Sequence, residues 1–259
     1  MQSALETACE AARVGGKILM ERLGKASVRE KAPADLVTDA DLASQKAIQS
    51  LLTIRFPGYA FVGEESSEEL RIEALACGKP VWIVDPLDGT ANFVHRLPSF
   101  SVSIALVDRD NVKLGVVYDP LSDVMYACSE EGVPRRDGRP IASSKCTEIG
   151  NAMVCCSFRP GVRREDPEVG HFLNVLERSR SLRRLGSAAL NLCYLAEGCL
   201  DAYWATSVKT WDVAAGYLIA KQAGVLFTSL SGGHFDLWNP QFVATSSPQL
   251  QQQMLGCMR

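Results

Sequence analysis

The amino-acid sequence predicts an α/β protein whose first half is α+β and whose second half is α/β. Two observations indicate that the first half is α+β. Two helical patterns come first, and they are followed by several apolar, β-forming runs separated by short polar turns, which is typical of an antiparallel meander. A third observation concerns the second half, where strand and helix patterns alternate after about residue 150, as they do in α/β proteins.

In the first half, small and apolar residues recur at helical spacing over residues 3–22 and again over residues 39–56, where a Pro-Gly pair ends the pattern. We expect a polar loop between these helices. Residues 60–62 are a short predicted strand, and the apolar run at 81–84 is typical of a buried strand. Further strands are expected over residues 101–107, 112–118 and 124–127.

The second half contains strand patterns that are each followed by a helical pattern. The strands are expected at residues 152–157, 181–184 and 200–204, and the helices near 167–178, 187–197 and 212–223. Between the halves, residues 134–140 are polar and rich in arginine, so we place a soft boundary near residue 145. The predicted division is therefore an N-terminal half, residues 1–145, and a C-terminal half, residues 146–259, in a chain long enough for two halves that share a core.

Composition excludes several classes of partner. Apolar residues make up 47% and charged residues 22% of the chain, and the net charge is −3. This charge gives no general attraction to nucleic acid or to an anionic membrane. No apolar run approaches the roughly 20 residues that a membrane span requires. A small basic group is expected to be a solvated helix end or strand edge: Arg178, Arg180, Arg183 and Arg184.

The nine cysteines do not form a recognisable framework, because no Cys-x-x-Cys pair occurs and Cys155 is adjacent to Cys156. Scattered thiols of this kind indicate a reducing compartment, so we expect a cytoplasmic protein. The three histidines lie far apart in the sequence, which argues against a zinc site.

Four acidic residues are candidates for a metal site. Glu64 follows a predicted strand, Asp85 and Asp88 follow another, and Asp212 lies at a predicted helix start. Glu64 alone could be a solvated loop acid, and Asp212 alone could be an ordinary helix cap. Asp85 and Asp88 together are more informative. They lie on a proline-stiffened turn after an apolar strand, where two carboxylates are costly to bury unless cations neutralise them. Oxygen ligands without His or Cys favour Mg²⁺, Mn²⁺ or Ca²⁺.

The next two residues add phosphate chemistry to this predicted site. Gly89 has no side chain to block a close approach to the backbone, and a helix starting there would offer free N–H groups to an anion. Thr90 could orient an attacking water if it has an acidic partner, and two metal ions could activate that water. The pattern does not fit a calcium-binding EF-hand loop. Its Asp-x-x-Asp-Gly-Thr spacing is one residue longer than that of haloacid-type phosphatases, which favours water over an aspartate nucleophile.

The sequence resembles the inositol monophosphatase family over nearly its whole length. The matching segments, in the family's order, are Asp35-Leu36-Val37-Thr38-Asp39-Ala40-Asp41, Gly63-Glu64-Glu65-Ser66, Trp82 to Phe93, Gly186-Ser187-Ala188-Ala189 and Trp211-Asp212-Val213-Ala214-Ala215-Gly216. One short motif could be chance, but five in order are specific. The resemblance implies a layered α/β/α/β/α sandwich of the sugar-phosphatase type, a homodimer, and the lithium inhibition found in many members.

The resemblance also implies roles for individual residues. Glu64, Asp85 and the carbonyl of Leu87 would hold one Mg²⁺, and Asp85, Asp88 and Asp212 would hold a second. A third, weaker ion would lie near Glu64, which also counts among the catalytic residues, so a subunit would bind two or three ions. Thr90, paired with Asp41, would activate the water. The amides of Gly89 and Thr90 would take the phosphate, and the alcohol part of the substrate would be bordered by Asp88, Gly186, Ser187, Ala188 and Asp212.

The implied function is a Mg-dependent phosphomonoesterase, a hydrolase acting on inositol monophosphate or a similar polyol or sugar phosphate. Members of the family often carry a Glu where this chain has Ala205, which weakens the case for inositol, and Lys209 could favour a more acidic substrate. Lys31 could contact the metal region. Histidinol phosphate and fructose 1,6-bisphosphate are alternative substrates within the same family. A nucleotide 3′-phosphate is a third, which the sequence Ala91-Asn92-Phe93 disfavours.

Two alternatives belong to other classes of protein. The first is a non-catalytic metal-binding scaffold, which the complete set of acids argues against, because clustered acids without a metal only cost stability. The second is a calcium-binding structural module, which would be stabilised by Ca²⁺ and would release no phosphate.

Overall fold

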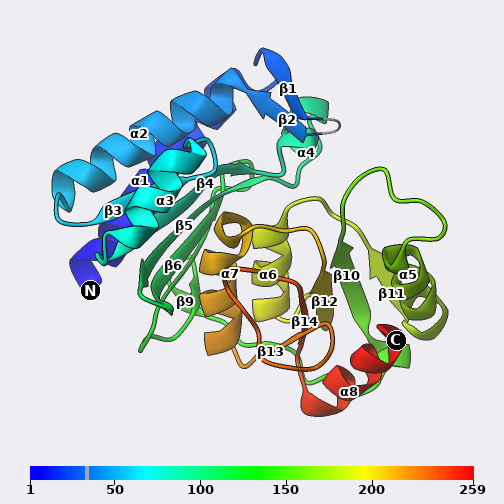
Figure 1. Cartoon of the computed structure of the whole chain (residues 1–259). Helices are drawn as coiled ribbons and strands as arrows, with labels where there is room; N and C mark the ends of the chain where they lie inside the picture. The colour runs from blue at the N-terminus through cyan, green and yellow to red at the C-terminus, as the bar shows by residue number, and fades with distance from the viewer. Residues whose placement is uncertain (33–34) are drawn as a thin grey trace.

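A computed structural model of the chain describes residues 1–32 and 35–259. It describes their side chains except within the segment 31–35. The fold is the layered α/β/α/β/α sandwich that the family resemblance implies (Figure 1). The first layer is α1 (Gln2–Arg22) and α2 (Asp39–Arg55), which confirms both predicted helices. The predicted polar loop between them is wrong. The described residues there form an antiparallel hairpin of β1 (Val28–Ala32) and β2 (Asp35–Thr38), whose charged strand sequence carries no apolar alternation.

The second layer is a sheet with the strand order β3-β4-β5-β6-β7-β8-β9. β3 pairs parallel with β4, and the strands from β4 onward pair antiparallel, which confirms the predicted meander. The bounds are β3 (Ala60–Gly63), β4 (Val81–Asp88), β5 (Ser101–Asp108), β6 (Asn111–Asp119), β7 (Val124–Ser129), β8 (Arg135–Arg136) and β9 (Arg139–Pro140). Two short helices, α3 (Glu68–Ala76) and α4 (Thr90–His95), lie in its connections and were not predicted as elements.

The remaining layers come from the second half of the chain. The middle layer is α6 (Ala188–Ala196) and α7 (Thr210–Gln222), and the outer layer is α5 (Pro167–Arg178) and α8 (Pro248–Cys257). Between them lies a sheet with the order β11-β10-β12-β14-β13. It is mixed, because β10 pairs parallel with β11 and β12 whereas β14 pairs antiparallel with β12 and β13. Its bounds, with those of one preceding 3-10 turn, are η1 (Ile149–Asn151), β10 (Met153–Ser157), β11 (Ser181–Arg183), β12 (Ala202–Ala205), β13 (Leu226–Ser229) and β14 (Phe242–Thr245).

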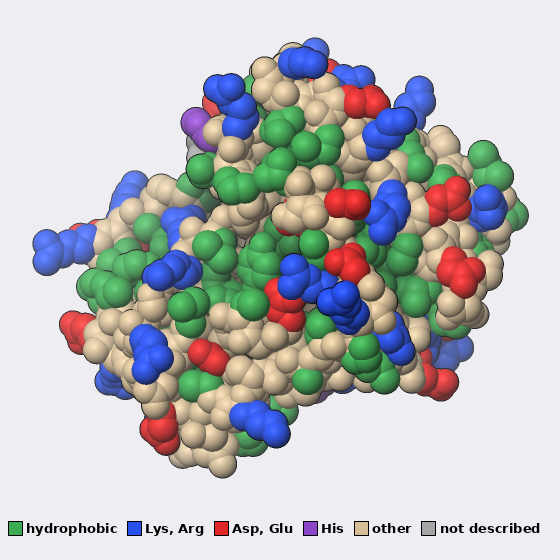
Figure 2. Space-filling model, turned by 180° about the vertical axis from the view of Figure 1, so that it is seen from behind, with side chains coloured by type: hydrophobic (Ala, Val, Ile, Leu, Met, Phe, Trp, Pro, Cys, Tyr) green, Lys and Arg blue, Asp and Glu red, His purple; other side chains and the backbone are tan. Residues whose placement is uncertain are grey.

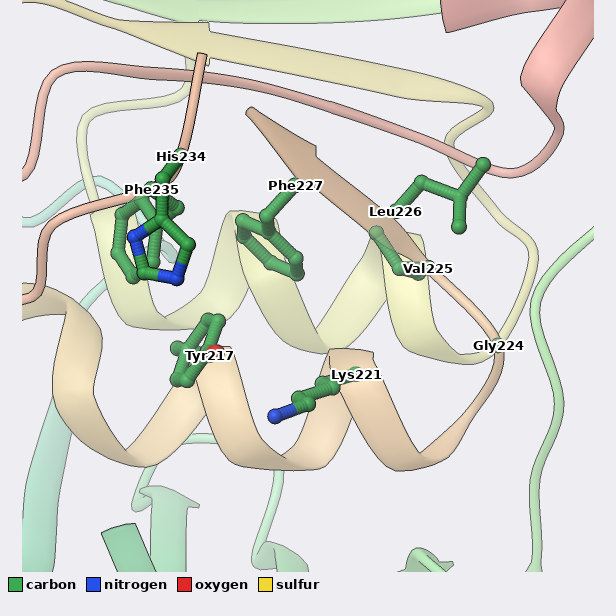
Figure 3. A pocket seen from close by; sticks show the side chains of 8 residues that line it. All are labelled: Tyr217, Lys221, Gly224, Val225, Leu226, Phe227, His234 and Phe235. Carbon is green, nitrogen blue, oxygen red and sulfur yellow. The ribbon is translucent and has the colours of Figure 1, made fainter. Parts of the chain in front are cut away.

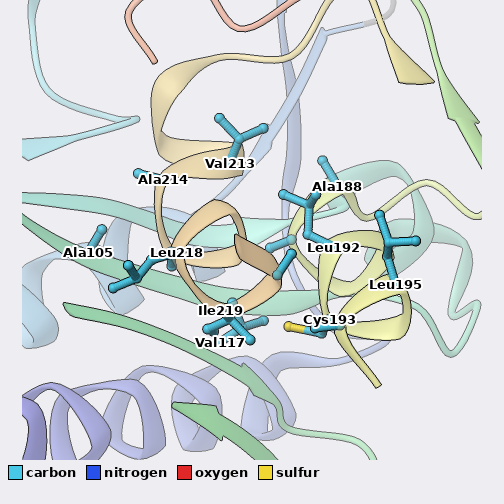
Figure 4. Packing of buried hydrophobic residues seen from close by; sticks show 14 of the residues in the cluster. Ala105, Val117, Ala188, Leu192, Cys193, Leu195, Val213, Ala214, Leu218 and Ile219 are labelled. Carbon is cyan, nitrogen blue, oxygen red and sulfur yellow. The ribbon is translucent and has the colours of Figure 1, made fainter. Parts of the chain in front are cut away.

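The middle helices bury apolar side chains that both halves of the chain supply. Figure 4 shows Leu192 of α6 and Ile219 of α7 packed together with Ala105 and Val117 of the first sheet. On the other face of that sheet, Trp82 belongs to a separate cluster beneath α1 and α2. The boundary proposed near residue 145 falls between the two sheets, but the core clusters do not divide there.

Four properties of the described residues bear on the partners and compartment expected from the sequence. Figure 2 shows acidic and basic side chains interspersed on one face of the molecule. The basic group at Arg178, Arg180, Arg183 and Arg184 is exposed, as expected. Among the described residues, no helix combines the length and the apolar character needed to cross a bilayer. All nine cysteines are free.

Gly115 of β6 lets α7 approach the first sheet. A Cβ at this position would lie 2.5 Å from the carbonyl oxygen of Ala215 and 2.8 Å from its Cα, both of them backbone atoms of α7. Backbone cannot rotate away as a side chain can, so a methyl group here would push the helix off the sheet. The substitution Gly115→Ala should therefore lower the free energy of unfolding by about 1–3 kcal/mol.

The matched control is Gly58→Ala, because no atom lies within 4 Å of a Cβ built there. Urea denaturation followed by circular dichroism measures both variants. The Gly58→Ala protein should unfold within about 0.5 kcal/mol of the wild type. Equal midpoints for the two variants would show that α7 can move without cost, contrary to this account.

Candidate active site

The acidic residues predicted from the sequence meet at one edge of the first sheet. Because β3 and β4 are parallel, with Gly63 opposite Val84, their carboxyl ends lie side by side. Glu64 directly follows β3, and its N–H donates to the carbonyl of Val84 at 3.0 Å. Asp85 and Asp88 come next on β4. The sheet register therefore brings Glu64 and the aspartate pair together.

A β-bulge turns Asp85 and Asp88 to the same face of the sheet. Residues three apart on a regular strand point to opposite faces. Here Asp85 lies opposite Ser103 and Asp88 opposite Ser101, so β4 contains one residue more than β5 over this stretch. Pro86 lies within the bulge, and its carbonyl accepts a hydrogen bond from Ser44 Oγ of α2 at 3.1 Å. Bulges commonly re-aim side chains beside active sites, and this one aims both carboxylates into the same cleft.

The fourth acid, Asp212, comes from the C-terminal half. It lies in the first turn of α7, where its Oδ2 accepts a hydrogen bond from the N–H of Lys209 at 2.8 Å. It therefore caps the helix, as its sequence position allowed, and it also lines the cleft. The cleft has a volume of about 300 Å³, and its lining residues are Leu36, Glu64, Asp85, Leu87, Asp88, Gly89, Thr90, Ala91, Gly186 and Asp212.

These carboxyl groups are strongly perturbed by one another. Burial, followed by the charges of Glu64, Asp212 and Asp88, raises the pKa of Asp85 well above its ordinary value. Burial, followed by the charges of Asp88 and Glu64, likewise raises the pKa of Asp212, while hydrogen bonding with Lys209 and Asp85 opposes the shift. Carboxylates crowded into one buried cleft need a shared proton or a cation between them.

The donor chemistry fits a hard divalent cation. The cleft offers carboxylate and carbonyl oxygens, the ligands that Mg²⁺ prefers, and lacks His and Cys among its lining residues. Within the described part of the chain, no three His, Cys, Asp or Glu side chains are already grouped closely enough to hold a metal ion. The case for Mg²⁺ therefore rests on the chemistry of the oxygen donors that line the cleft.

Asp88 also joins the two halves of the chain, a role that sequence reasoning missed. Its Oδ1 accepts from the N–H of Ala188 at 3.0 Å, and its Oδ2 accepts from the N–H of Ala189 at 2.8 Å and from the hydroxyl of Ser187. These donors belong to the start of α6. Burial raises the pKa of Asp88, although the bonds from this segment oppose the shift. The segment from Gly186 to Ala188 is thus brought beside Asp88, as the resemblance implies.

Thr90 and Asp41 lie together, as the resemblance implies. Thr90 Oγ1 is 3.4 Å from Asp41 Oδ1 and 3.1 Å from the carbonyl oxygen of Leu87. Asp41 is held by the cap of α2, where its Oδ2 accepts from the N–H of Thr38 at 2.8 Å and from the Thr38 hydroxyl at 2.5 Å. Burial raises the pKa of Asp41 to about 6. The hydroxyl of Thr90 therefore has a proton acceptor within reach.

Two glycines shape the side of the cleft where an anion could approach. Gly89 has φ +93°, and a Cβ there would lie 2.9 Å from the carbonyl oxygen of Ser99. Gly186 has the same φ, and a Cβ there would lie 2.6 Å from Nδ2 of Asn92. Asn92 Nδ2 donates to the carbonyls of Ser99 and Leu185, both at 2.7 Å, and so fixes Gly186 beside Gly89. Asn92 was part of a predicted motif but was given no role.

A second cavity, of about 360 Å³, lies near the far end of α7. Figure 3 shows the rings of Tyr217, Phe227 and Phe235 lining it together with Lys221 and His234. Its lining residues include no carboxylate, so the acidic cleft is the candidate for metal-assisted chemistry. The side chain of Lys31 lies outside the described residues, so its expected contact stays a prediction.

Comparison with known proteins relates the whole chain to inositol monophosphatases and SuhB proteins. The sequence model of the inositol monophosphatase family matches residues 1–258. Inositol monophosphatase 3 of Solanum lycopersicum is 38% identical over 255 residues, which cover 94% of this chain and 92% of the relative. Nus factor SuhB of Pasteurella multocida is 36% identical over 263 residues, covering 99% and 96%. The crystal structure of extragenic suppressor protein suhB from Bartonella henselae has a TM-score of 0.91 and 29% identity, covering 99% of this chain and 98% of that one.

The chain therefore belongs to the inositol monophosphatase family, and it is a phosphomonoesterase of that family. The family is generally Mg²⁺-dependent, in agreement with the oxygen ligands of the acidic cleft.

Neutralising Asp85 should stabilise the metal-free protein. Raised pKa values mean that the folded apo protein binds protons more tightly than the unfolded chain. The stability from these groups is complete below about pH 4, the pKa of an unfolded Asp, and is lost as the pH rises through the folded values. In EDTA at pH 8, Asp85→Asn should therefore melt above the wild type, by about 2–4 °C for each kcal/mol of repulsion relieved. The difference should shrink toward pH 4.

The same variant should lose most of the thermal shift that Mg²⁺ gives the wild type, because a ligand that binds only the folded state stabilises it. Asp88→Asn is the contrasting control. It should melt below the wild type even in EDTA, since an amide nitrogen would face the donors at the start of α6. Differential scanning fluorimetry with Mg²⁺ or EDTA measures both effects. A lower melting temperature for Asp85→Asn in EDTA would contradict the repulsion described here.

Proposed function

We propose that this chain is a Mg²⁺-dependent phosphatase of inositol monophosphate or a similar polyol or sugar phosphate, using water as the nucleophile. The observation that carries the proposal is the convergence of Glu64, Asp85, Asp88 and Asp212 on a cleft that also contains the Thr90–Asp41 pair. The names of the relatives support the choice of an inositol phosphate.

The metal ligands in this proposal are Glu64, Asp85 and the carbonyl of Leu87 for one ion, and Asp85, Asp88 and Asp212 for a second. A third, weaker ion near Glu64 brings the number to three. Bound Mg²⁺ would supply positive charge that makes water a better nucleophile and stabilises the leaving oxygen. The high pKa values of Asp85 and Asp212 support this assignment, because a cation relieves the repulsion that raises them.

Thr90 and Asp41 would handle the proton of the attacking water. The Thr90 hydroxyl can accept a hydrogen bond from the water while it donates its own hydrogen to Asp41, whose carboxylate is the final acceptor. Asp41 is well placed for this because Thr38 holds its other oxygen in a fixed direction. The buried position of Asp41 keeps its pKa near the working range of a general base.

The phosphate would lie on the amides of Gly89 and Thr90, where the absence of a side chain on Gly89 leaves the backbone accessible. Helix α4 has only 6 residues, so individual N–H groups matter more here than a helix dipole. The alcohol part of the substrate would be bordered by Asp88, Asp212 and the segment Gly186, Ser187 and Ala188.

Substrate choice depends on which hydroxyl acceptors the cleft provides. Ala205 ends β12 and is fully buried, so it offers no hydrogen-bond acceptor at that position. Recognition of substrate hydroxyls would therefore fall to the acids and the backbone beside Gly186. Histidinol phosphate and fructose 1,6-bisphosphate are the alternative substrates. We also propose that the enzyme is a cytoplasmic homodimer, as the resemblance implies and as its free cysteines support for the compartment.

A non-catalytic role is the alternative from another class, and some relatives carry the name Nus factor. The Thr90 hydroxyl and its buried acceptor Asp41 favour catalysis, because a non-catalytic scaffold needs neither of them. The two roles differ in phosphate release.

The first test is phosphate release with Mg²⁺ from inositol 1-phosphate, fructose 1,6-bisphosphate, histidinol phosphate, glycerol 2-phosphate and adenosine 3′,5′-bisphosphate. We expect inositol 1-phosphate or another polyol or sugar phosphate to exceed the rest in kcat/KM, and all activity to disappear in EDTA. Calcium should inhibit, because its looser coordination suits in-line transfer poorly. Metal binding without phosphate release from any compound would favour the scaffold.

Thr90→Val should lower kcat by about 10²–10⁴-fold, because it keeps the shape of the side chain but removes the hydroxyl. Thr90→Ser is the matched control and should keep most of the activity. In the wild type, kcat should fall as the pH drops below about 6, since Asp41 must be deprotonated to accept the proton. Steady-state assays from pH 5 to 8 measure both. Equal rates for the valine and serine variants would remove Thr90 from the mechanism.

A further inference from the structure

Arg71 of α3 contacts the backbone of the segment that carries Glu64. Its Nε and Nη2 both donate to the carbonyl of Ser66, at 3.0 and 2.8 Å, and Nη2 also reaches the carbonyl of Glu64 at 3.4 Å. The guanidinium group thus caps the turn that follows β3. This turn positions the Glu64 carboxylate at the edge of the cleft.

The same guanidinium group contacts the C-terminal half of the chain. Its central carbon lies 4.9 Å from the centroid of the Trp211 ring, within the range of a cation–π contact. Trp211 immediately precedes Asp212, and its carbonyl accepts a hydrogen bond from Ser103 Oγ at 3.1 Å. One side chain therefore touches both the turn after Glu64 and the residue before Asp212.

The packing of α3 does not by itself explain these contacts. None of its residues is buried, and its large apolar side chains are exposed, with Leu70 at 57% and Ile72 at 62%. Arg71 is half-buried, and its guanidinium group contacts the Ser66 carbonyl and the Trp211 ring. The helix is thus a lightly attached element whose long cation reaches into the space between two acidic segments.

We infer that Arg71 is a positioning residue that sets the affinity of the cleft for Mg²⁺. It holds the Glu64 turn and the start of α7 at a fixed separation, so that carboxylates from the two halves can serve the same group of ions. Its planar fork allows two N–H groups to donate to the one Ser66 carbonyl while the same plane stacks on Trp211, and lysine cannot reproduce this combination. The inference rests on the proposed function, because it assumes that Glu64 and Asp212 are metal ligands.

The test compares Arg71→Ala and Arg71→Lys with the wild type. Calorimetric titration of EDTA-stripped protein with Mg²⁺ alone gives Kd, and phosphate release against Mg²⁺ concentration gives the half-saturating metal level. Loss of a partner that orients a metal ligand commonly weakens metal binding by roughly 10–100-fold, so we expect both variants to raise Kd by that factor. At saturating Mg²⁺ their kcat should return to near the wild-type value.

Arg13→Lys is the matched control. The Arg13 guanidinium also stacks on an aromatic ring, 5.2 Å from the centroid of Tyr118, and pairs with Asp123 at 2.7 Å, but neither partner adjoins Glu64 or Asp212 in the sequence. This exposed pair should be worth little, so Kd for Mg²⁺ should change by less than about twofold. A wild-type Kd in both Arg71 variants, or a lasting loss of kcat at saturating Mg²⁺, would overturn the inference.

A double-mutant cycle adds a second readout. Trp211→Leu should weaken Mg²⁺ binding, and combining it with Arg71→Ala should add little, because both changes remove the same contact. Fully additive effects would show that the two residues act separately, against this inference. If the wild type binds Mg²⁺ but releases no phosphate, the proposed function fails while the titrations still decide the role of Arg71.

Discussion

The site depends on hydrogen bonds between the two halves of the chain. The start of α6, in the second half, donates them to the carboxylate of Asp88, on β4 of the first half. Two backbone N–H groups and the Ser187 hydroxyl all point at this one carboxylate. Burial raises the pKa of Asp88, but these three donors oppose the shift, whereas neighbouring charges add to the raised pKa values of Asp85 and Asp212. The arrangement fixes the position of α6, and the neighbouring α7 then presents Asp212 to the same cleft.

The acids of the cleft therefore have two kinds of surroundings. Asp88 is held by protein donors, whereas Asp85 and Asp212 lie close to one another and are relieved chiefly by a cation. The hydrogen bonds between Asp88 and the start of α6 fix the two halves relative to one another. The repulsion between the carboxylates of Asp85 and Asp212 favours the binding of a cation.

Much of this site could be predicted from the sequence because the signals are local. Asp85, Asp88, Gly89 and Thr90 follow one apolar strand, and a turn rich in acids, proline and glycine has few structural explanations. The bulge was hidden, since spacing alone would put Asp85 and Asp88 on opposite faces, and only the register against Ser101 and Ser103 reveals the extra residue.

Other features depended on contacts between distant segments. The partners of Asp88 lie about 100 residues away in the sequence, and the sequence does not mark Arg71 among the other arginines. The elements that were not predicted, such as the β1–β2 hairpin and α3, were missed for a related reason. The hairpin β1–β2 carries charged residues in place of apolar alternation, and α3 buries none of its side chains, so neither shows the periodicity on which sequence interpretation relies. The long, half-buried helices and the meander, with strong periodic patterns, were predicted close to their observed bounds.

The helical layer of α6 and α7 lies between two sheets and provides an apolar surface to each of them. A ribosome completes the first sheet well before it makes these helices, so the nascent chain exposes one whole apolar face until it has been extended from Pro140, the end of β9, to Gln222, the end of α7. During that interval the uncovered face is the kind of apolar surface to which chaperones, or other unfinished copies of the chain, bind.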